Sequence, residues 1–361
     1  MEREIYERLR QHVNHLGHGF SATTTGAELR LLQKLFTEEH AKIYLHLSAD
    51  LETPEQIAQR EGLDPRRLAE VLNGMAEAGL VFPKRVGEQR YYAAAPAFHG
   101  FGEHQVLRMD ADLAQRLEDY NLSEKIPEAP PPGRKAVTTL PLRTIPVNAT
   151  ISISRPIAPY EDVKEIIRKQ DRLAVAKCYC FAQQEALGKH SNQPQEVCLF
   201  LGFYADYYVD LGMGRRINQD EALEILRIAE EAGLVHQIPN TTDPGAICNC
   251  GPDCCGQLNA LKNLPNPAAY VMSDHFAETK PDLCNSCEFC VTRCPMIAIT
   301  MSKDSIAEIS RERCIGCGLC VSTCPTDAVV LANKSGPELQ EQPGFTTQFM
   351  RSSQDIESTI R

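Results

Sequence analysis

The sequence predicts a multidomain α+β protein, and three features of the chain indicate this class. Capped, periodic helical segments fill the first part of the chain and end in a short hairpin pattern. A proline-rich stretch then interrupts the regular pattern, and mixed helix and strand signals follow it. Two cysteine blocks with short flanking strands form the last ordered part. Because 361 residues exceed one ordinary domain of about 100–150 residues, we expect several separate cores.

The sequence pattern of residues 26–95 predicts a compact helical unit that ends in a hairpin. Thr53 has the residue type of a helix cap, Pro54 suits the first helical position, and Gln56 completes a capping box. Gly87 marks a turn between two strand-like runs. The expected helices are Gly26–Phe36, Glu38–Leu47, Thr53–Glu61 and Arg66–Ala78, and the expected strands contain Leu80–Phe82 and Arg90–Tyr92.

This order of helices and hairpin resembles the winged-helix domains of bacterial transcription regulators of the MarR and ArsR type. Between Gly26 and Pro96 there are nine Lys or Arg and eleven Asp or Glu, so the segment carries 9 − 11 = −2. A DNA-binding domain usually shows a basic stripe. We therefore expect this segment to make protein contacts or to pair two copies of the chain, and we do not expect DNA as its main partner.

Changes in composition divide the rest of the chain into a linker, two further domains and a tail. Six prolines between residues 123 and 147 exclude a regular helix and favour an extended linker. Beyond it we expect a helix over Tyr160–Lys169, a strand over Leu173–Ala176 and a capped helix over Asn218–Ala232. The expected parts are 1–122 (winged-helix-like domain with flanking helices), 123–147 (linker), 148–269 (central cysteine-containing domain), 270–332 (cysteine-block module, with a hairpin of Ala298–Met301 and Ile306–Ile309) and 333–361 (polar tail).

Eight of the fifteen cysteines form one spacing written twice, C-x2-C-x2-C-x3-C-P. This spacing holds [4Fe-4S] clusters in bacterial two-cluster ferredoxins, where the fourth cysteine of each block binds the other cluster. Two complete [4Fe-4S] clusters are therefore expected. Zinc is the alternative, but four thiolates suffice for zinc and leave the repeated spacing unexplained. The predicted ligands are Cys284, Cys287, Cys290 and Cys324 for the first cluster and Cys314, Cys317, Cys320 and Cys294 for the second.

The other seven cysteines lie in the middle of the chain and form a candidate third metal site. Their clustering in C-x-C pairs and in a turn-rich loop leaves three alternatives open. A third iron–sulfur cluster would match the chemistry of the C-terminal blocks, a zinc ion could be held by four thiolates, and the thiols could be free or form a redox-active pair. The seven residues are Cys178, Cys180, Cys198, Cys248, Cys250, Cys254 and Cys255.

Several central motifs together resemble a family of proteins from anaerobes. The motifs are Lys177-Cys178-x-Cys180, Pro194-x-Glu196-x-Cys198-Leu199, Gly214–Ile217 and the Ile247–Cys250 loop. Members of that family join a winged-helix N-terminus to a two-cluster ferredoxin end. The resemblance covers nearly the whole chain and implies electron transfer in an anaerobic host, without indicating a substrate.

Composition narrows the location and the partners. The chain starts with charged residues and has no apolar stretch long enough for a membrane span, so neither a secretory signal nor a span is expected. Cysteines at ligand spacings suit a reducing cytoplasm. The net charge of −11 disfavours nucleic acid and favours a redox partner that docks through a basic patch.

The sequence thus predicts an electron-transfer protein or subunit rather than a stand-alone enzyme. It would pass single electrons through its clusters to or from a redox enzyme or carrier. Two alternatives remain at this point. One is a redox-sensing winged-helix transcription regulator, and the other is an oxidoreductase whose substrate binds at the central cysteines.

Overall fold

The computed structural model describes residues 2–16, 19–126, 142–147, 162–239 and 244–334. These residues divide into two compact units. The first contains the described residues up to 126 together with Ala182–His190. The second contains 142–147, the stretch from 162 to Phe181 and the stretch from Ser191 to 334.

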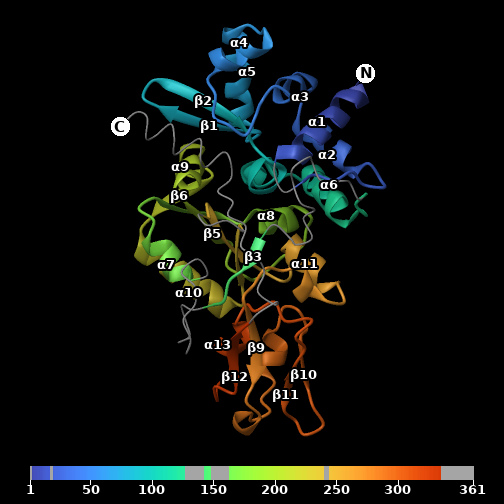
Figure 1. Ribbon diagram of the computed structural model, residues 1–361, viewed down its shortest axis with the longest axis vertical. Helices are drawn as coiled ribbons and strands as arrows, with labels where there is room; N and C mark the ends of the chain where they lie inside the picture. The colour runs from blue at the N-terminus through green and yellow to red at the C-terminus, as the bar shows by residue number, and fades with distance from the viewer. Residues whose placement is uncertain (1, 17–18, 127–141, 148–161, 240–243, 335–361) are drawn as a thin grey trace. The chain divides into compact units, whose positions relative to one another are not determined.

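The first unit consists of helices and one β-hairpin (Figure 1). A π-helical turn (Ala97–Phe101) and a 3₁₀ helix (Glu103–Arg108) connect the hairpin to the last helix. The helices are α1 (Glu2–Leu16), α2 (Ala27–Leu35), α3 (Glu38–Tyr44), α4 (Pro54–Glu61), α5 (Pro65–Glu77) and α6 (Ala111–Leu122), and the hairpin is β1 (Val81–Val86) with β2 (Gln89–Ala94).

Cap chemistry fixes the two helices before the hairpin, as the sequence predicts. The Thr53 hydroxyl accepts from the backbone N–H of Gln56 at 3.2 Å, and the Gln56 side chain accepts from the N–H of Thr53 at 2.8 Å. Asp64 accepts from the first N–H groups of α5, and Gly62 ends α4 with a φ of 69°. The expected helices and the hairpin are confirmed, each within a few residues of its predicted ends.

The helices and the hairpin of the first unit share one apolar core. Tyr44, Phe36, Leu72 and Phe82 are almost completely buried. Glu52, just before α4, forms a bridge with Tyr92 of β2 through two backbone hydrogen bonds of 2.8 and 3.0 Å. This bridge adds a third extended segment to the hairpin, so the chain before α4 is tied to the strand that follows α5.

The second unit is built on a six-stranded antiparallel sheet with the strand order β3-β7-β8-β5-β4-β6. Its strands are β3 (Leu142–Thr144), β4 (Leu173–Lys177), β5 (Glu196–Leu201), β6 (Gly214–Ile217), β7 (Val235–Pro239) and β8 (Ala246–Cys250). Its helices are α7 (Val163–Arg168), α8 (Tyr179–Ala186, of which the residues from Ala182 belong to the first unit), α9 (Phe203–Asp210), α10 (Gln219–Ala232) and α11 (Gly256–Lys262).

One face of this sheet packs against α7 and α10. Ile166 and Leu226 from the helices join Val175, Leu199 and Ile247 from the strands in a single buried cluster. Helix α10 begins at an Asn218 cap and ends at Gly233, which has a φ of 88°. The predicted strand over Leu173–Ala176 and the predicted helix over Asn218–Ala232 are therefore confirmed as β4 and α10.

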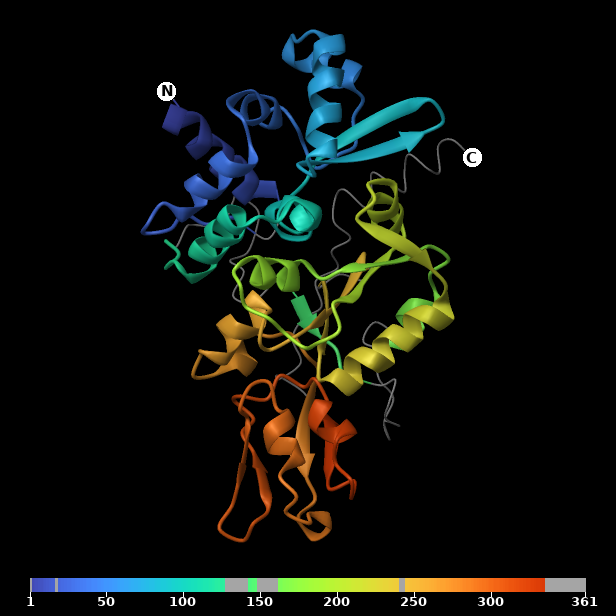
Figure 2. The ribbon, with the colours of Figure 1, turned by 180° about the vertical axis from the view of Figure 1, so that it is seen from behind.

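The C-terminal elements form a small module within the second unit (Figures 1 and 2, orange to red). Strand β12 pairs antiparallel with β9, and β10 pairs antiparallel with β11, which confirms the predicted hairpin. The elements are β9 (His275–Thr279), α12 (Phe289–Arg293), β10 (Ile299–Met301), β11 (Ala307–Ile309), α13 (Leu319–Ser322) and β12 (Val329–Asn333).

The structure corrects the end of the predicted linker. Leu142–Thr144 is not linker but strand β3, which pairs with β7 at the edge of the sheet. The prolines misled the prediction because an edge strand tolerates them nearby while a central strand does not. Most of the predicted linker, residues 127–141, and residues 335–361 of the predicted tail lie outside the described residues.

Candidate metal centres

The two C-terminal cysteine blocks repeat their backbone as well as their spacing. In the first block, Ser286 and Glu288 on either side of Cys287 have φ values of 62° and 60°. In the second block, Gly316 and Gly318 on either side of Cys317 have φ values of 72° and 76°. Successive turns of this kind make the loop curl, so that its backbone N–H groups face inward as they do in anion-binding nests.

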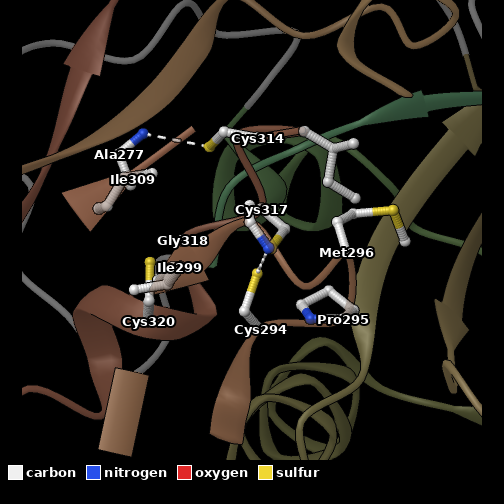
Figure 3. Close-up of a pocket in the computed structure, with 12 residues that line it drawn as sticks. Ala277, Cys294, Pro295, Met296, Ile299, Ile309, Cys314, Cys317, Gly318 and Cys320 are labelled. Carbon is white, nitrogen blue, oxygen red and sulfur yellow. Dashed lines mark hydrogen bonds between the residues drawn. The ribbon is translucent and has the colours of Figure 1, made fainter. Parts of the chain in front are cut away.

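The second predicted ligand set lines one pocket (Figure 3). Cys294, Cys314, Cys317 and Cys320 all face this pocket, together with apolar side chains such as Ile299. Cys294 therefore lies with the other block, as the crossed ligand assignment requires. Two backbone N–H groups already point at these sulfurs, from Ala298 to Cys294 Sγ at 3.2 Å and from Ala277 to Cys314 Sγ at 3.4 Å.

The first predicted ligand set lies closer to solvent. Cys290 is buried, whereas Cys284, Cys287 and Cys324 are only partly buried. Cys290 interacts electrostatically with both Cys287 and Cys324, which places the crossing cysteine near its predicted partners. Burial raises the pKa of Cys324, but backbone N–H groups of Thr326 and Val329 outweigh this and lower its pKa overall.

The donors of both sets fit iron–sulfur clusters. Each set offers four thiols. In the second set, N–H groups are available to sulfur and the pocket also has apolar lining, and in the first set backbone N–H groups approach Cys324. The residues that would hold the clusters are those predicted from the spacing. A bound cluster would supply one-electron chemistry, and the protein adjusts the potential through N–H bonds to sulfur, burial and nearby charge.

The seven central cysteines come from four segments of the second unit. Cys178 and Cys180 follow β4, Cys198 lies in β5, Cys248 and Cys250 lie in β8, and Cys254 and Cys255 precede α11. Hydrogen-bond contacts join Cys178 to Cys180 and Cys198, Cys255 to Cys180 and Cys250, and Cys250 to Cys248. Cys198 and Cys248 also interact electrostatically. We refer to Cys178, Cys180, Cys198, Cys248, Cys250 and Cys255 as the thiol ring.

Five thiols of the ring have pKa values shifted in opposite directions. Hydrogen bonds from Cys180 and Cys198 hold the pKa of Cys178 well below its usual range, and hydrogen bonds from Cys180 and Cys250 do the same for Cys255. The donors, including Cys180, have raised pKa values because they give their protons to these acceptors. The contacts between the thiols thus favour the negative charge at Cys178 and Cys255, and thiols bind metals in the thiolate form.

Cys254 interacts with Cys178 and Cys255 of the ring through charge rather than through a hydrogen-bond contact. Its pKa is raised mainly by burial, and its thiol lies 3.8 Å from the carbonyl oxygen of Gly251. In the described part of the chain, no three His, Cys, Asp or Glu side chains are arranged around a single metal ion.

A buried polar network supports the ring from the α10 side of the sheet. Glu230 and His236 are fully buried, with 3.0 Å between Glu230 Oε1 and His236 Nε2. The imidazole Nδ1 of His236 lies 2.5 Å from Asn249 Oδ1, and Asn249 Nδ2 donates to the carbonyl of Val197 at 2.6 Å. Asn249 lies between Cys248 and Cys250, and Val197 precedes Cys198, so the network fixes the backbone of three ring members.

Two arginines tie the C-terminal module to helix ends of the same unit. Arg293, between two cysteines of the first block, donates to the carbonyls of Glu230 and Glu231 at the end of α10, both at 2.6 Å. Arg313, next to Cys314, donates to the carbonyls of Met296, Leu264 and Lys262 at 2.9, 3.0 and 2.9 Å. Cations at helix C-termini also interact favourably with the helix dipole.

Helix α11 therefore connects the two cysteine regions. Its N-cap residue is Cys255, whose sulfur is approached by the backbone N–H groups of Gln257 and Leu258. Its last residue, Lys262, accepts from Arg313 beside Cys314. No local sequence motif indicates the roles of Arg313, Glu230 or His236. Arg313 reaches carbonyls of other segments, and His236 joins Glu230 to Asn249 only once β7 pairs with β8.

Comparison with known families identifies the C-terminal module. Residues 277–331 match a family described as a 4Fe-4S dicluster domain. This module is a 4Fe-4S ferredoxin-type domain, so an iron–sulfur electron-transfer role follows for the chain in general terms. No curated protein matches the chain. Among the described helices, none is both long and apolar enough to cross a membrane.

Proposed function

We propose that this protein passes single electrons between a redox partner and a third metal centre on the thiol ring, through two [4Fe-4S] clusters. The ligands would be Cys284, Cys287, Cys290 and Cys324 for the first cluster and Cys314, Cys317, Cys320 and Cys294 for the second. The third centre would be an iron–sulfur cluster. The protein would act as a component of an oxidoreductase system in a reducing cytoplasm.

The observation that carries this proposal is a core shared by the two cysteine regions. Cys250 and Cys255 of the thiol ring belong to the same buried cluster as Cys314, Cys317 and Cys320. Val147 belongs to that cluster too, and its N–H donates to the carbonyl of Cys317 at 3.0 Å. Continuous packing without intervening solvent is what a fixed electron path between metal centres needs.

Burial differs between the two C-terminal ligand sets. Three of the four cysteines in the first set are half-buried, whereas three of the four in the second set are buried. Cys290 of the first set shares its core with the buried cysteines of the second set and with Cys250 and Cys255 of the ring. Exposed apolar side chains surround the first block: Leu283 is 46% exposed, Phe289 56% and Ile297 60%. We infer that a redox partner docks over the first cluster through these apolar side chains. The partner would surround this contact with basic side chains that complement the acidic surface of this protein.

For the N-terminal unit we propose a winged-helix segment over residues 27–94 that makes protein contacts or pairs two copies of the chain. The order of helices, the hairpin and the Glu52–Tyr92 bridge support this fold. Several of its basic side chains already bind other groups. Arg67 pairs with Glu39 at 2.8 Å and Glu70 at 3.4 Å, and Arg90 donates to Asn73 at 2.5 Å. The charges of Arg67 on α5 and Arg90 on the hairpin are thus less available to phosphates than the sequence suggests.

Metal analysis tests the proposal directly. The full chain is purified without oxygen, and iron, acid-labile sulfide and zinc are measured per polypeptide, with spin-counted EPR after reduction. Three clusters require about twelve iron atoms, and two require about eight. About twelve iron without zinc is the expected result. About eight iron would remove the third centre, and zinc in the C-terminal blocks would overturn electron transfer altogether.

A pair of variants locates the third centre on the ring. Cys255→Ser removes a ring thiol that contacts Cys180 and Cys250, so the iron content should fall by about four atoms. Cys254→Ser is the comparison variant, because Cys254 is the neighbour of Cys255 but interacts with the ring thiols Cys178 and Cys255 through charge rather than through hydrogen-bond contacts. An equal loss of iron in both variants would contradict the ring assignment.

A further inference from the structure

Two polar side chains of the second unit are buried without hydrogen-bond partners among the described residues. Gln237 in β7 is 0% exposed, and neither its amide nitrogen nor its amide oxygen has a partner. Thr144 in β3 is also 0% exposed, and its hydroxyl has none. Leaving a buried polar group unpaired destabilises the fold, so two of them side by side call for a reason.

Strand register places both side chains beside the thiol ring. Thr144 lies opposite Gln237 in the β3–β7 ladder, and Gln237 lies opposite Cys248 in the β7–β8 ladder. Directly opposite residues share a face of the sheet and have Cβ atoms about 4.5–5.5 Å apart. Thr144, Gln237 and Cys248 therefore form a row across three strands, with the amide between the hydroxyl and the thiol.

This row lies on the face opposite the buried Glu230 network. His236 and Asn249 are the neighbours of Gln237 and Cys248 along their strands, and successive side chains point to opposite faces. His236 and Asn249 bind each other and Glu230, so they are not available to Gln237. The amide must find its partners on the thiol side.

The chemistry of the row fixes which partner each group takes. A metal-bound thiolate or cluster sulfide only accepts hydrogen bonds, so it satisfies the amide nitrogen of Gln237 but not the oxygen. The oxygen needs a donor, and the Thr144 hydroxyl on its other side can supply one. The three atoms are not hydrogen-bonded to one another in the structure. If the Gln237 amide turned its nitrogen toward Cys248, a chain from Thr144 to Gln237 to sulfur would pair all three groups.

We propose that Gln237 is a positioning residue of the central centre: its amide N–H donates to sulfur at Cys248, and the Thr144 hydroxyl holds the amide in that orientation. The inference rests on the proposed function, in which the thiol ring holds an iron–sulfur cluster. An N–H bond to sulfur stabilises the extra negative charge of the reduced cluster and so raises its potential. Gln237 thereby makes the central centre easier to reduce than it would be without this hydrogen bond.

Redox titration of the full chain, followed by EPR, tests this role. In Gln237→Leu, the ratio of reduced to oxidised central centre at a fixed potential should fall about tenfold, which for one electron is a midpoint about 59 mV lower. Thr144→Val should shift the midpoint in the same direction by a smaller amount. The C-terminal clusters should keep their midpoints, because the row does not reach them. Gln219→Leu, at an exposed glutamine that binds the carbonyls of Arg168 and Gln170, is the control.

The outcomes separate this inference from the proposed function. About twelve iron atoms in the wild type with an unchanged central midpoint in Gln237→Leu would overturn the inference alone. About eight iron atoms in the wild type would overturn the third centre, and the inference with it. If Gln237→Leu loses the central iron, Thr144→Val decides: a lowered midpoint supports the chain of hydrogen bonds, and an unchanged one overturns it.

Discussion

The two cysteine regions of the second unit are built in contrasting ways. The C-terminal blocks are local: each takes three ligands from seven consecutive residues and repeats the same left-handed turns beside its middle cysteine. The thiol ring is assembled from four distant segments that meet only when the sheet forms. Local spacing alone can predict the first kind of site, whereas the second depends on strand order and register.

The contrast extends to what holds each site in place. In the C-terminal module, loop turns and backbone N–H groups position the sulfurs. Around the thiol ring, the ladder of β5, β8 and β7 and the Glu230–His236–Asn249 network do so from one face of the sheet. Damage to a loop should therefore affect one cluster, while damage to the sheet should affect the ring and the fold together.

The largest effect is expected when a ligand of the buried second cluster is removed, compared with a ligand of the half-exposed first cluster. Cys317→Ser should remove about four iron atoms and also break the path to the thiol ring, because Cys317 belongs to the shared core. Cys287→Ser should remove a similar amount of iron but leave the second and central clusters in contact. Iron analysis with EPR checks both variants. Retention of all iron in Cys317→Ser would contradict its role as a ligand.

A glycine substitution tests the left-handed turns of the blocks. A Cβ at Gly316, where φ is 72°, would collide with the His275 carbonyl oxygen and Ser273 Oγ, so Gly316→Ala should displace the second cysteine loop from β9. Gly62→Ala is the control, since Gly62 has a φ of 69° but no atom within 4 Å of such a Cβ. We expect a cost of about 1 kcal/mol for the control and several-fold more for Gly316→Ala, measured by denaturant unfolding.

Both variants could instead lose the same unfolding free energy. In that case backbone strain alone would explain the loss, and close packing of the loop on Ser273 and His275 would contribute nothing. Equal unfolding free energies for the two variants would therefore contradict the account of how the second block is held.

A substitution of Arg313 tests the link between the two cysteine regions, and its expected effect is of intermediate size. Arg313→Met removes three hydrogen bonds to carbonyls, including those at the end of α11, and should cost about 2–4 kcal/mol of unfolding free energy. Arg311→Met is a nearby control, in which the Arg311 guanidinium lies 3.6 Å from the centre of the Phe276 ring, a contact usually worth about 0.5–1 kcal/mol. Weaker magnetic coupling between the second and central clusters in Arg313→Met, detected by EPR relaxation, should accompany the loss of stability.

The smallest expected effect lies in the first unit. Arg67 is exposed and binds Glu39 and Glu70, and exposed ion pairs contribute little because water and salt screen them. Arg67→Gln should therefore leave both the unfolding free energy and the retention on duplex DNA essentially unchanged. A strong, salt-dependent loss of DNA retention would favour a DNA-binding role instead.

Sequence reasoning reached the local features and missed those that depend on tertiary contacts. The Thr53 capping box, the Asn218 cap and the hairpin before Ile309 could be predicted because their determinants lie within a few residues of one another. Leu142–Thr144 was expected to be linker because its short strand has meaning only next to β7. Six of the seven central cysteines form the thiol ring, and Cys254 does not have their hydrogen-bond contacts. The sequence could not predict this difference, because Cys254 and Cys255 are adjacent and equivalent in the sequence pattern.

The central claim is that electrons pass from the C-terminal clusters to the thiol ring through the shared core. Freeze-quench EPR on the full chain, reduced by methyl viologen radical, tests it most directly. The C-terminal signals should appear first and the central signal after them, and Cys287→Ser should slow the appearance of the central signal while leaving its final size unchanged. A central signal that appears equally fast in the wild type and in Cys287→Ser, or that never appears, would contradict the account.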